Sequence, residues 1–173
     1  MRFSICSGNH GNSNSITDTV TWLQRALQEC GHRADINTGI EPRAVNILIE
    51  HFVDEKALRD LLEGRRLGAR YLLIATEPIV GGVFNGGIED QHWHYGNTDY
   101  WRLRFDAFKI AARMAEEIWV LAESMLPAYE QLFPDLPVRF LPHGHVNELA
   151  CVRQRPEPER DIDFYFSGSM TEH

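Results

Sequence analysis

The chain has 173 residues, of which 43% are hydrophobic and 24% are charged, which suits one globular domain and excludes a disordered or fibrous chain. Its formal net charge of −8 excludes a non-specific nucleic-acid binder, because such a protein needs a basic face to neutralise phosphates. The three cysteines form no CxxC pair, so neither a disulfide framework nor a cysteine-based zinc site is indicated, and a reducing, cytoplasmic compartment is expected.

The chain begins with a short apolar run, a small polar loop and an amphipathic helix. The run at 2–7 predicts a strand, and the loop at 8–15 consists of glycine and small polar residues apart from one histidine. From Ile16 to Cys30 the apolar residues recur at spacings of four and three, which places them on one helical face. Ser15 stands at the expected N-cap of this helix.

Apolar runs and helical faces alternate along the rest of the chain. The predicted strands are 33–37, 45–52, 71–76, 118–122 and 138–141, and the predicted helices are 55–67, 99–116 and 124–133. The run at 71–76 is almost entirely apolar, which is typical of a strand buried on both faces. Strands that alternate with helices form parallel β-α-β units. The sequence therefore predicts an α/β fold, a Rossmann-like three-layer domain with a mainly parallel sheet.

The C-terminal residues differ in composition from the rest of the chain. Residues 148–160 contain two prolines and many charges, as a linker does. The next segment, 161–169, combines an apolar run with a glycine turn. We therefore expect a domain at 1–147, a linker at 148–160 and the start of a second, truncated domain at 161–173.

Ligands of a parallel sheet bind beyond the carboxyl ends of its strands, so the loops that follow strands are the candidate sites. In the loop at 8–15, Gly8 and Gly11 let a ligand approach the backbone, and the helix that follows favours an anion at its N-terminus. The loop matches neither the GxGxxG fingerprint nor the Walker A motif. His10 in this loop can accept a proton from a hydroxyl, because imidazole titrates near neutral pH.

A second candidate loop follows the strand at 71–76. Glu77 comes directly after that strand and is expected to point into the same crevice, which makes it the rival general base. The long loop at 78–98 carries several glycines together with the aromatic residues Phe84, Trp93 and Tyr95. This mixture suits a lid or a carbohydrate-binding wall.

Two His-x-His pairs, His92/His94 and His143/His145, also lie in loops. Alternate residues of a strand face the same side, so each pair could chelate a metal. The pairs lie in glycine-rich loops without a helical HExxH arrangement, so no metal is expected. His143 and His145 are expected in a turn that brings a histidine near the crevice.

Several segments carry a resemblance to a known family. They are the opening SGNHGNSNS loop with its helix, the runs YLLIATEP, EEIWVLAES and VRFLPHGHVNE, and the final DIDFYFSGSMTEH. The first four resemble the N-terminal domain of GT-B glycosyltransferases, and the last is similar to the first strand and glycine turn of the family's C-terminal domain. The likeness is to bacterial relatives of the spore-maturation glycosyltransferases, and it covers nearly the whole chain.

The resemblance implies two facing Rossmann-like domains with the active site between them, and catalysis without a metal or other cofactor. The N-terminal domain would hold the acceptor, and the C-terminal domain would hold the nucleotide-sugar donor. It implies His10 as the catalytic base, with Glu77 as the alternative. The candidate acceptor-binding residues are Asn12, Asn14, Trp93, His94, His143 and His145. The candidate donor-binding residues are Gly8, Gly11, Ser167, Gly168 and Ser169.

The reaction that the resemblance implies is attack by an acceptor hydroxyl on the anomeric carbon of the donor, with loss of a nucleoside diphosphate. Because most of the family's donor domain has no counterpart here, the chain is expected to be incomplete and inactive alone. The expected partners are a nucleotide sugar and a carbohydrate or other hydroxyl acceptor, without nucleic acid. No apolar run reaches about 18 residues, so no membrane span is expected.

Two other interpretations stay open. A flavodoxin-like protein would hold the phosphate of FMN in a loop after the first strand, where Ser7-Gly8 and Asn12-Ser13 could serve, and Trp93 or Tyr95 could stack on the flavin. A non-catalytic interaction domain would keep the fold and bind no small molecule.

Overall fold

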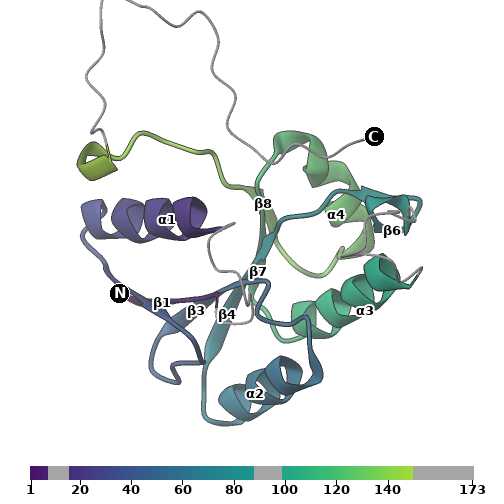
Figure 1. Cartoon of the computed structure of the whole chain (residues 1–173), viewed down its shortest axis with the longest axis horizontal. Helices are drawn as coiled ribbons and strands as arrows, with labels where there is room; N and C mark the ends of the chain where they lie inside the picture. The colour runs from purple at the N-terminus through teal and green to yellow at the C-terminus, as the bar shows by residue number, and fades with distance from the viewer. Residues whose placement is uncertain (8–15, 88–98, 150–173) are drawn as a thin grey trace, which may run out of the picture.

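A computed structural model describes residues 1–7, 16–87 and 99–149 of the chain. Six parallel strands of this part form one sheet in the order β2-β1-β3-β4-β7-β8, and helices flank it (Figure 1). The strands are β1 (Arg2–Cys6), β2 (Arg33–Asn37), β3 (Val45–Ile49), β4 (Arg70–Ala75), β7 (Glu117–Val120) and β8 (Val138–Phe140). The helices are α1 (Thr17–Glu29), α2 (Glu55–Arg66), α3 (Tyr100–Ala112) and α4 (Leu126–Leu132). The predicted α/β, Rossmann-like three-layer fold is confirmed.

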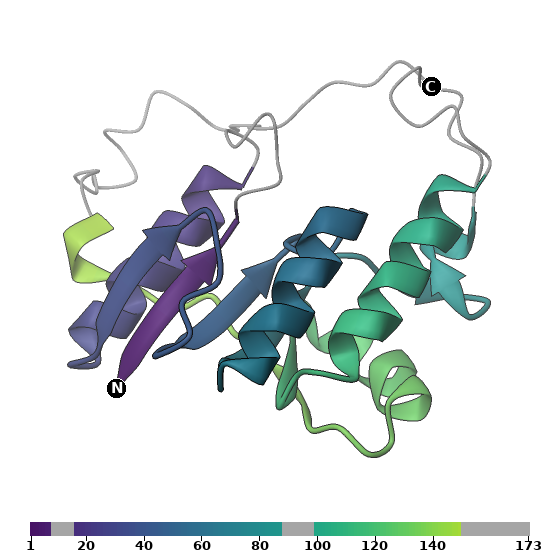
Figure 2. The same cartoon turned by 90° about the horizontal axis from the view of Figure 1, so that it is seen from below.

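The two faces of the sheet carry separate hydrophobic clusters. Helix α1 covers one face, where Val20 and Leu23 pack with Ile5 and Ile47. Helices α2 and α3 lie side by side on the other face (Figures 1 and 2). There Leu61 and Phe108 belong to a larger cluster, to which α4 also contributes. Two covered faces explain why the central strands are apolar almost throughout.

Central strand β3 contains one buried amide, which fastens the chain between β2 and β3. The side chain of Asn46 is fully buried. Its Oδ1 accepts a hydrogen bond from the backbone N–H of Glu41 at 2.8 Å, and its Nδ2 donates to the carbonyl of the same residue at 3.0 Å. A buried amide is tolerated in a sheet because its donors and acceptor are used. The short connection between the two strands therefore needs no helix to hold it.

Helix α2 approaches β4 closely, and a glycine permits this. A Cβ atom on Gly64 would lie 2.4 Å from the hydroxyl oxygen of Tyr71, closer than two such atoms can come. That hydroxyl donates to the carbonyl of Leu61 at 2.7 Å. Gly64 therefore permits the close contact between α2 and β4.

The structure corrects three details of the predicted elements. The first part of the predicted loop at 78–98 contains a hairpin, β5 (Ile79–Val80) and β6 (Val83–Phe84), followed by the 3₁₀ helix η2 (Asn85–Gly87). Phe84 of this hairpin is buried against Phe105 and Phe108 of α3, so it belongs to the core and not to the predicted lid or carbohydrate-binding wall. Strand β3 stops three residues before the predicted end at 52, because Glu50 leaves the extended backbone with φ 56°. Helix α3 ends at Ala112, four residues before the predicted end at 116.

The predicted capping of α1 falls partly outside the described residues. Ser15, the expected N-cap, is not among them. The structure assigns the cap position to Ile16, which makes no side-chain capping hydrogen bond. Gly31 follows the helix with φ 79°, as expected for a helix terminator.

A segment that we call the strap, residues 141–149, crosses the outer side of α1 after β8 (Figure 1). The 3₁₀ helix η4 (Asn147–Leu149) ends it. Arg25 pairs with Glu148 at 3.0 Å, and Glu29 accepts hydrogen bonds from Asn147 and from the backbone of Glu148. Helix α1 is thus held between the sheet and the strap. The predicted linker at 148–160 and the predicted second domain at 161–173 lie almost entirely outside the described residues.

Candidate functional site

The order of the strands locates the crevice where a ligand is expected. From β1 the chain moves to β2 on one side, and it then crosses to β3 on the other side. The strand order therefore reverses between β1 and β3. In open parallel sheets, ligands bind at this reversal, outside the carboxyl ends of the strands.

A buried ion pair stands at this edge of the sheet. Glu50 follows β3 and is 2% exposed, and Arg104 of α3 is 9% exposed. Arg104 binds Glu50 through two nitrogens, with Nε to Oε2 at 2.9 Å and Nη2 to Oε1 at 2.5 Å. The hydroxyl of Thr76 also donates to Glu50. Burial alone would lower the pKa of Arg104, but Glu50 and then Glu77 raise it above its ordinary value, so the guanidinium stays charged.

Glu77 extends this network from the end of β4 towards solvent. Arg104 Nη2 lies 2.9 Å from Glu77 Oε1, and Asn85 donates to Glu77 Oε2 at 2.8 Å. The hydroxyl of Tyr129 donates to the backbone carbonyl of Glu77 at 2.7 Å. The Glu77 side chain remains 21% exposed. The Glu77 carboxylate is therefore fixed in direction by α3 and η2, its backbone is held by α4, and its side chain stays partly exposed.

The backbone is strained at two points of this network. Among the described residues, Glu50 (φ 56°) and Asn85 (φ 52°) are the only non-glycine residues with positive φ. Asparagine tolerates this conformation, but glutamate adopts it rarely. Such strain costs about 1–3 kcal/mol for each residue and concentrates at functional sites. Glu50 binds Arg104, Asn85 binds Glu77, and Arg104 and Glu77 bind each other. Both strained residues therefore belong to one cluster, which we take as the candidate site.

His51, next to Glu50, is a buried imidazole. It is 2% exposed, and neither of its ring nitrogens has a hydrogen-bond partner among the residues that the structure describes. Burial lowers the pKa of His51 below its ordinary value of 6.5, so the ring is neutral at physiological pH. Buried polar atoms in native proteins are almost always paired. An unpaired neutral imidazole at the reversal of strand order is therefore available to a hydroxyl or water.

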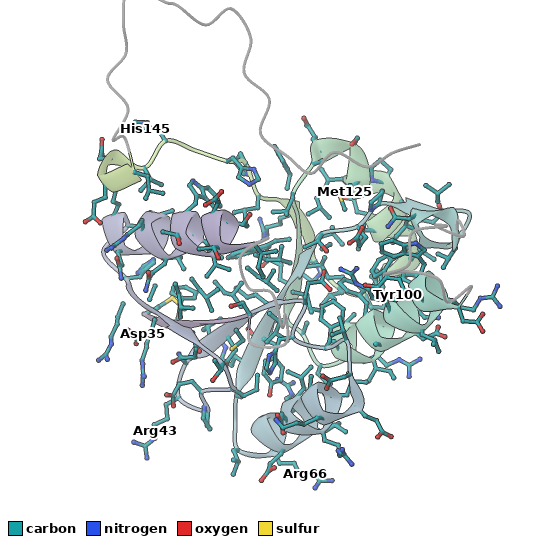
Figure 3. The ribbon with its side chains drawn as sticks, in the orientation of Figure 1. Asp35, Arg43, Arg66, Tyr100, Met125 and His145 are labelled. Carbon is teal, nitrogen blue, oxygen red and sulfur yellow. The ribbon has the colours of Figure 1, made fainter. Side chains whose placement is uncertain are left out.

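The structure places three of the predicted site residues. Glu77 lies at the carboxyl edge, as expected from its position after a strand. His143 and His145 lie on the strap and are exposed. Figure 3 shows His145 on the side of α1 that faces away from the sheet. The two histidines are thus beside α1 and do not contact the Glu50–Arg104–Glu77 cluster.

The other predicted site residues fall outside the part of the chain that the structure describes. They are Gly8, His10, Gly11, Asn12, Asn14, Trp93, His94, Ser167, Gly168 and Ser169. Their assigned roles remain predictions. In the described ranges, no group of three or more His, Cys, Asp and Glu side chains is arranged to hold a metal.

The sequence patterns do not predict several residues of the cluster. Glu50 and His51 fall within the predicted strand at 45–52, and Arg104 is a polar residue of a helix that is predicted from its apolar positions. One signal was available: an arginine at position 104 falls one residue before Phe105, on the buried side of the helical pattern. A charged residue at such a position usually has a buried partner. The hairpin that carries Asn85 also had a signal, since Gly81-Gly82 between two apolar pairs is a two-residue turn.

Comparisons with models of protein families, with curated proteins and with solved structures found no match for this chain. In the described residues, no helix has both the length and the apolar character that crossing a membrane requires. The geometry at the carboxyl edge of the sheet is therefore the basis on which a function can be argued.

Proposed function

We propose that the chain is the acceptor-side part of a glycosyltransferase, which moves a sugar from a nucleotide-sugar donor to an acceptor hydroxyl. The observation that carries this proposal is the orientation of Glu77. Its carboxylate lies at the carboxyl edge of the sheet and is held by Arg104 and Asn85, and the side chain is partly exposed. The resemblance of several segments to GT-B glycosyltransferases supports the same reaction class.

The proposed step is a displacement at the anomeric carbon of the donor. The acceptor oxygen forms a bond to that carbon, the bond from the carbon to the diphosphate oxygen breaks, and the nucleoside diphosphate leaves with the electron pair. A general base takes the hydroxyl proton. Glu77 can serve because each carboxylate oxygen has a further lone pair beyond the bond to Arg104 or Asn85. His10 remains the alternative base.

Arg104 positions this base without contacting the substrate. It is buried, and its guanidinium binds both Glu50 and Glu77. The buried Glu50 fixes the guanidinium, and the guanidinium fixes Glu77. A base that is held before the substrate arrives loses little entropy in the transition state. The donor contacts at Gly8, Gly11, Ser167, Gly168 and Ser169 remain part of the proposal.

The test is release of nucleoside diphosphate by the complete product of the gene. The purified protein is incubated with UDP-, GDP-, dTDP- and CDP-sugars, each with and without a mixture of carbohydrate acceptors. We expect one donor class to release its nucleoside diphosphate faster when acceptor is present. A correctly folded protein that releases none from any donor would contradict the proposal.

One observation favours a second candidate function, the binding of FMN. The strand order β2-β1-β3-β4-β7 corresponds to the 2-1-3-4-5 order of flavodoxin-like sheets, in which FMN binds at the reversal between the first and third strands. The same purified protein distinguishes the two candidates. A flavin absorbance spectrum that survives dialysis would favour FMN, whereas a colourless protein that consumes a nucleotide sugar would favour transfer.

A further inference from the structure

A hollow of about 450 Å³ lies between the first half of α1 and the strap, away from the Glu50–Arg104–Glu77 cluster. Small-molecule sites typically measure about 300–1,000 Å³. The residues that line it are Asp18, Thr19, Thr21, Trp22, His143 and Leu149. All of them belong to the described part of the chain, and four come from one helix.

Two aromatic rings form one wall of the hollow. The ring centroids of Trp22 and His143 are 4.8 Å apart, with 34° between the ring planes. Trp22 is partly buried against the core of the sheet, and its Nε1 donates to the carbonyl of Gly144 at 2.9 Å. This hydrogen bond and the packing fix the indole in one orientation. His143 is exposed, so the aromatic wall is open to a ligand.

Polar side chains of α1 also line the hollow. Asp18 is exposed, and its carboxylate makes no hydrogen bond or ion pair with the described residues. Thr19 and Thr21 contribute hydroxyl groups. The lining contains a carboxylate and no lysine or arginine, so it repels a phosphate and suits an uncharged ligand that donates hydrogen bonds.

A sugar ring has an apolar face that suits the two aromatic rings and hydroxyl groups that suit the oxygen atoms of the lining. The C–H face of a pyranose is apolar and packs on aromatic rings, while its hydroxyls donate to carboxylate and hydroxyl oxygens. We propose that this hollow binds a ring of a neutral carbohydrate, stacked on the Trp22–His143 pair with its hydroxyls directed to Asp18. The proposal rests on the proposed function in that the ring would belong to the acceptor, which is then a carbohydrate.

The test measures binding without turnover, by calorimetry on the complete gene product with methyl glycosides of glucose, galactose and mannose and with their disaccharides. His143→Ala removes the exposed ring, and Asp18→Asn removes the carboxylate. Because an aromatic contact contributes about 0.5–1.5 kcal/mol, His143→Ala should weaken binding about two- to tenfold. Phe140→Ala removes another exposed ring, three residues before His143 and outside the hollow, and is the matched control that should bind as the wild type does.

Three results would overturn the inference. These are no binding of any neutral sugar, equal binding by the His143→Ala and Phe140→Ala variants, and binding of uridine or adenosine that His143→Ala weakens while no sugar binds. The same measurements distinguish failure of the carbohydrate site from failure of the transfer reaction. Release of nucleoside diphosphate without sugar binding in the hollow would contradict the carbohydrate site alone. Sugar binding as described without consumption of any donor would contradict the transfer reaction and support the carbohydrate site.

Discussion

At the scale of the residue, Arg104 holds the candidate site together. It joins the buried Glu50 to the partly open Glu77, and both contacts are within hydrogen-bonding distance. A buried ion pair adds little net stability, because each charge loses its hydration on burial. Removal of one partner is costly, because the other charge is then left uncompensated. The pair therefore fixes a geometry more than it stabilises the fold.

Arg104→Met should lower the free energy of unfolding by about 3–5 kcal/mol, because Glu50 then stays buried without its cation. The Arg104→Met/Glu50→Leu double variant should recover most of that loss. Urea unfolding measures both changes. Arg102→Met, an exposed arginine on the same helix, is the control and should change stability by less than about 0.5 kcal/mol. A loss for Arg104→Met as small as the control's would show that the pair is not buried as described.

At the scale of the element, the turn between β3 and α2 carries the least satisfied polar group of the described chain. His51 lies in this turn, and the charged residues of the adjacent helix are Asp54, Lys56 and Asp60. Burial lowers the pKa of His51 more than the two nearby carboxylates raise it, so this pKa lies below the ordinary 6.5 in the folded protein. The turn begins at the strained Glu50, so strain and a missing hydrogen bond coincide.

Acid should destabilise the protein partly through His51. Above pH 6.5 the imidazole is neutral in both states and contributes no pH dependence. As the pH falls below 6.5, the unfolded chain binds the proton first, so stability is lost by up to about 1.4 kcal/mol for each pH unit until the folded pKa is reached. His51→Gln should remove this part of the pH dependence in urea unfolding between pH 7.5 and pH 5. The exposed His145→Gln should leave it unchanged, and equal slopes for the two variants would contradict the account.

The predicted elements show which sequence signals are sufficient. Apolar runs located the six strands of the sheet, and the spacing in 99–116 located α3, because both patterns report which side chains are buried. The same patterns do not report polar residues that are buried in pairs. Glu50 and Arg104 are 54 positions apart in the sequence, so no local pattern shows that they meet. Glu77 could be predicted because its position after a strand is itself the signal.

At the scale of the whole molecule, the fold brings the ends of β3 and β4 and the start of α3 to one edge. The strand order reverses at that edge, and Glu50, His51 and Glu77 all follow strands that end there. A second feature, the hollow under the strap, lies on the outer side of α1. The loops that follow the strands gather at one edge because every strand of a parallel sheet runs in the same direction. The central prediction is that Glu77 acts on a ligand at the carboxyl edge.

The most direct test of that claim compares two glutamate variants of the complete gene product in the nucleoside diphosphate release assay. Glu77→Gln keeps the shape of the side chain and removes the charge and the base, and Glu63→Gln does the same at an exposed position on α2. A general base contributes about 10²–10⁴-fold to the rate. We expect Glu77→Gln to lower kcat by at least about 100-fold with little change in the melting temperature, and Glu63→Gln to behave as the wild type. A wild-type kcat for Glu77→Gln would contradict the claim.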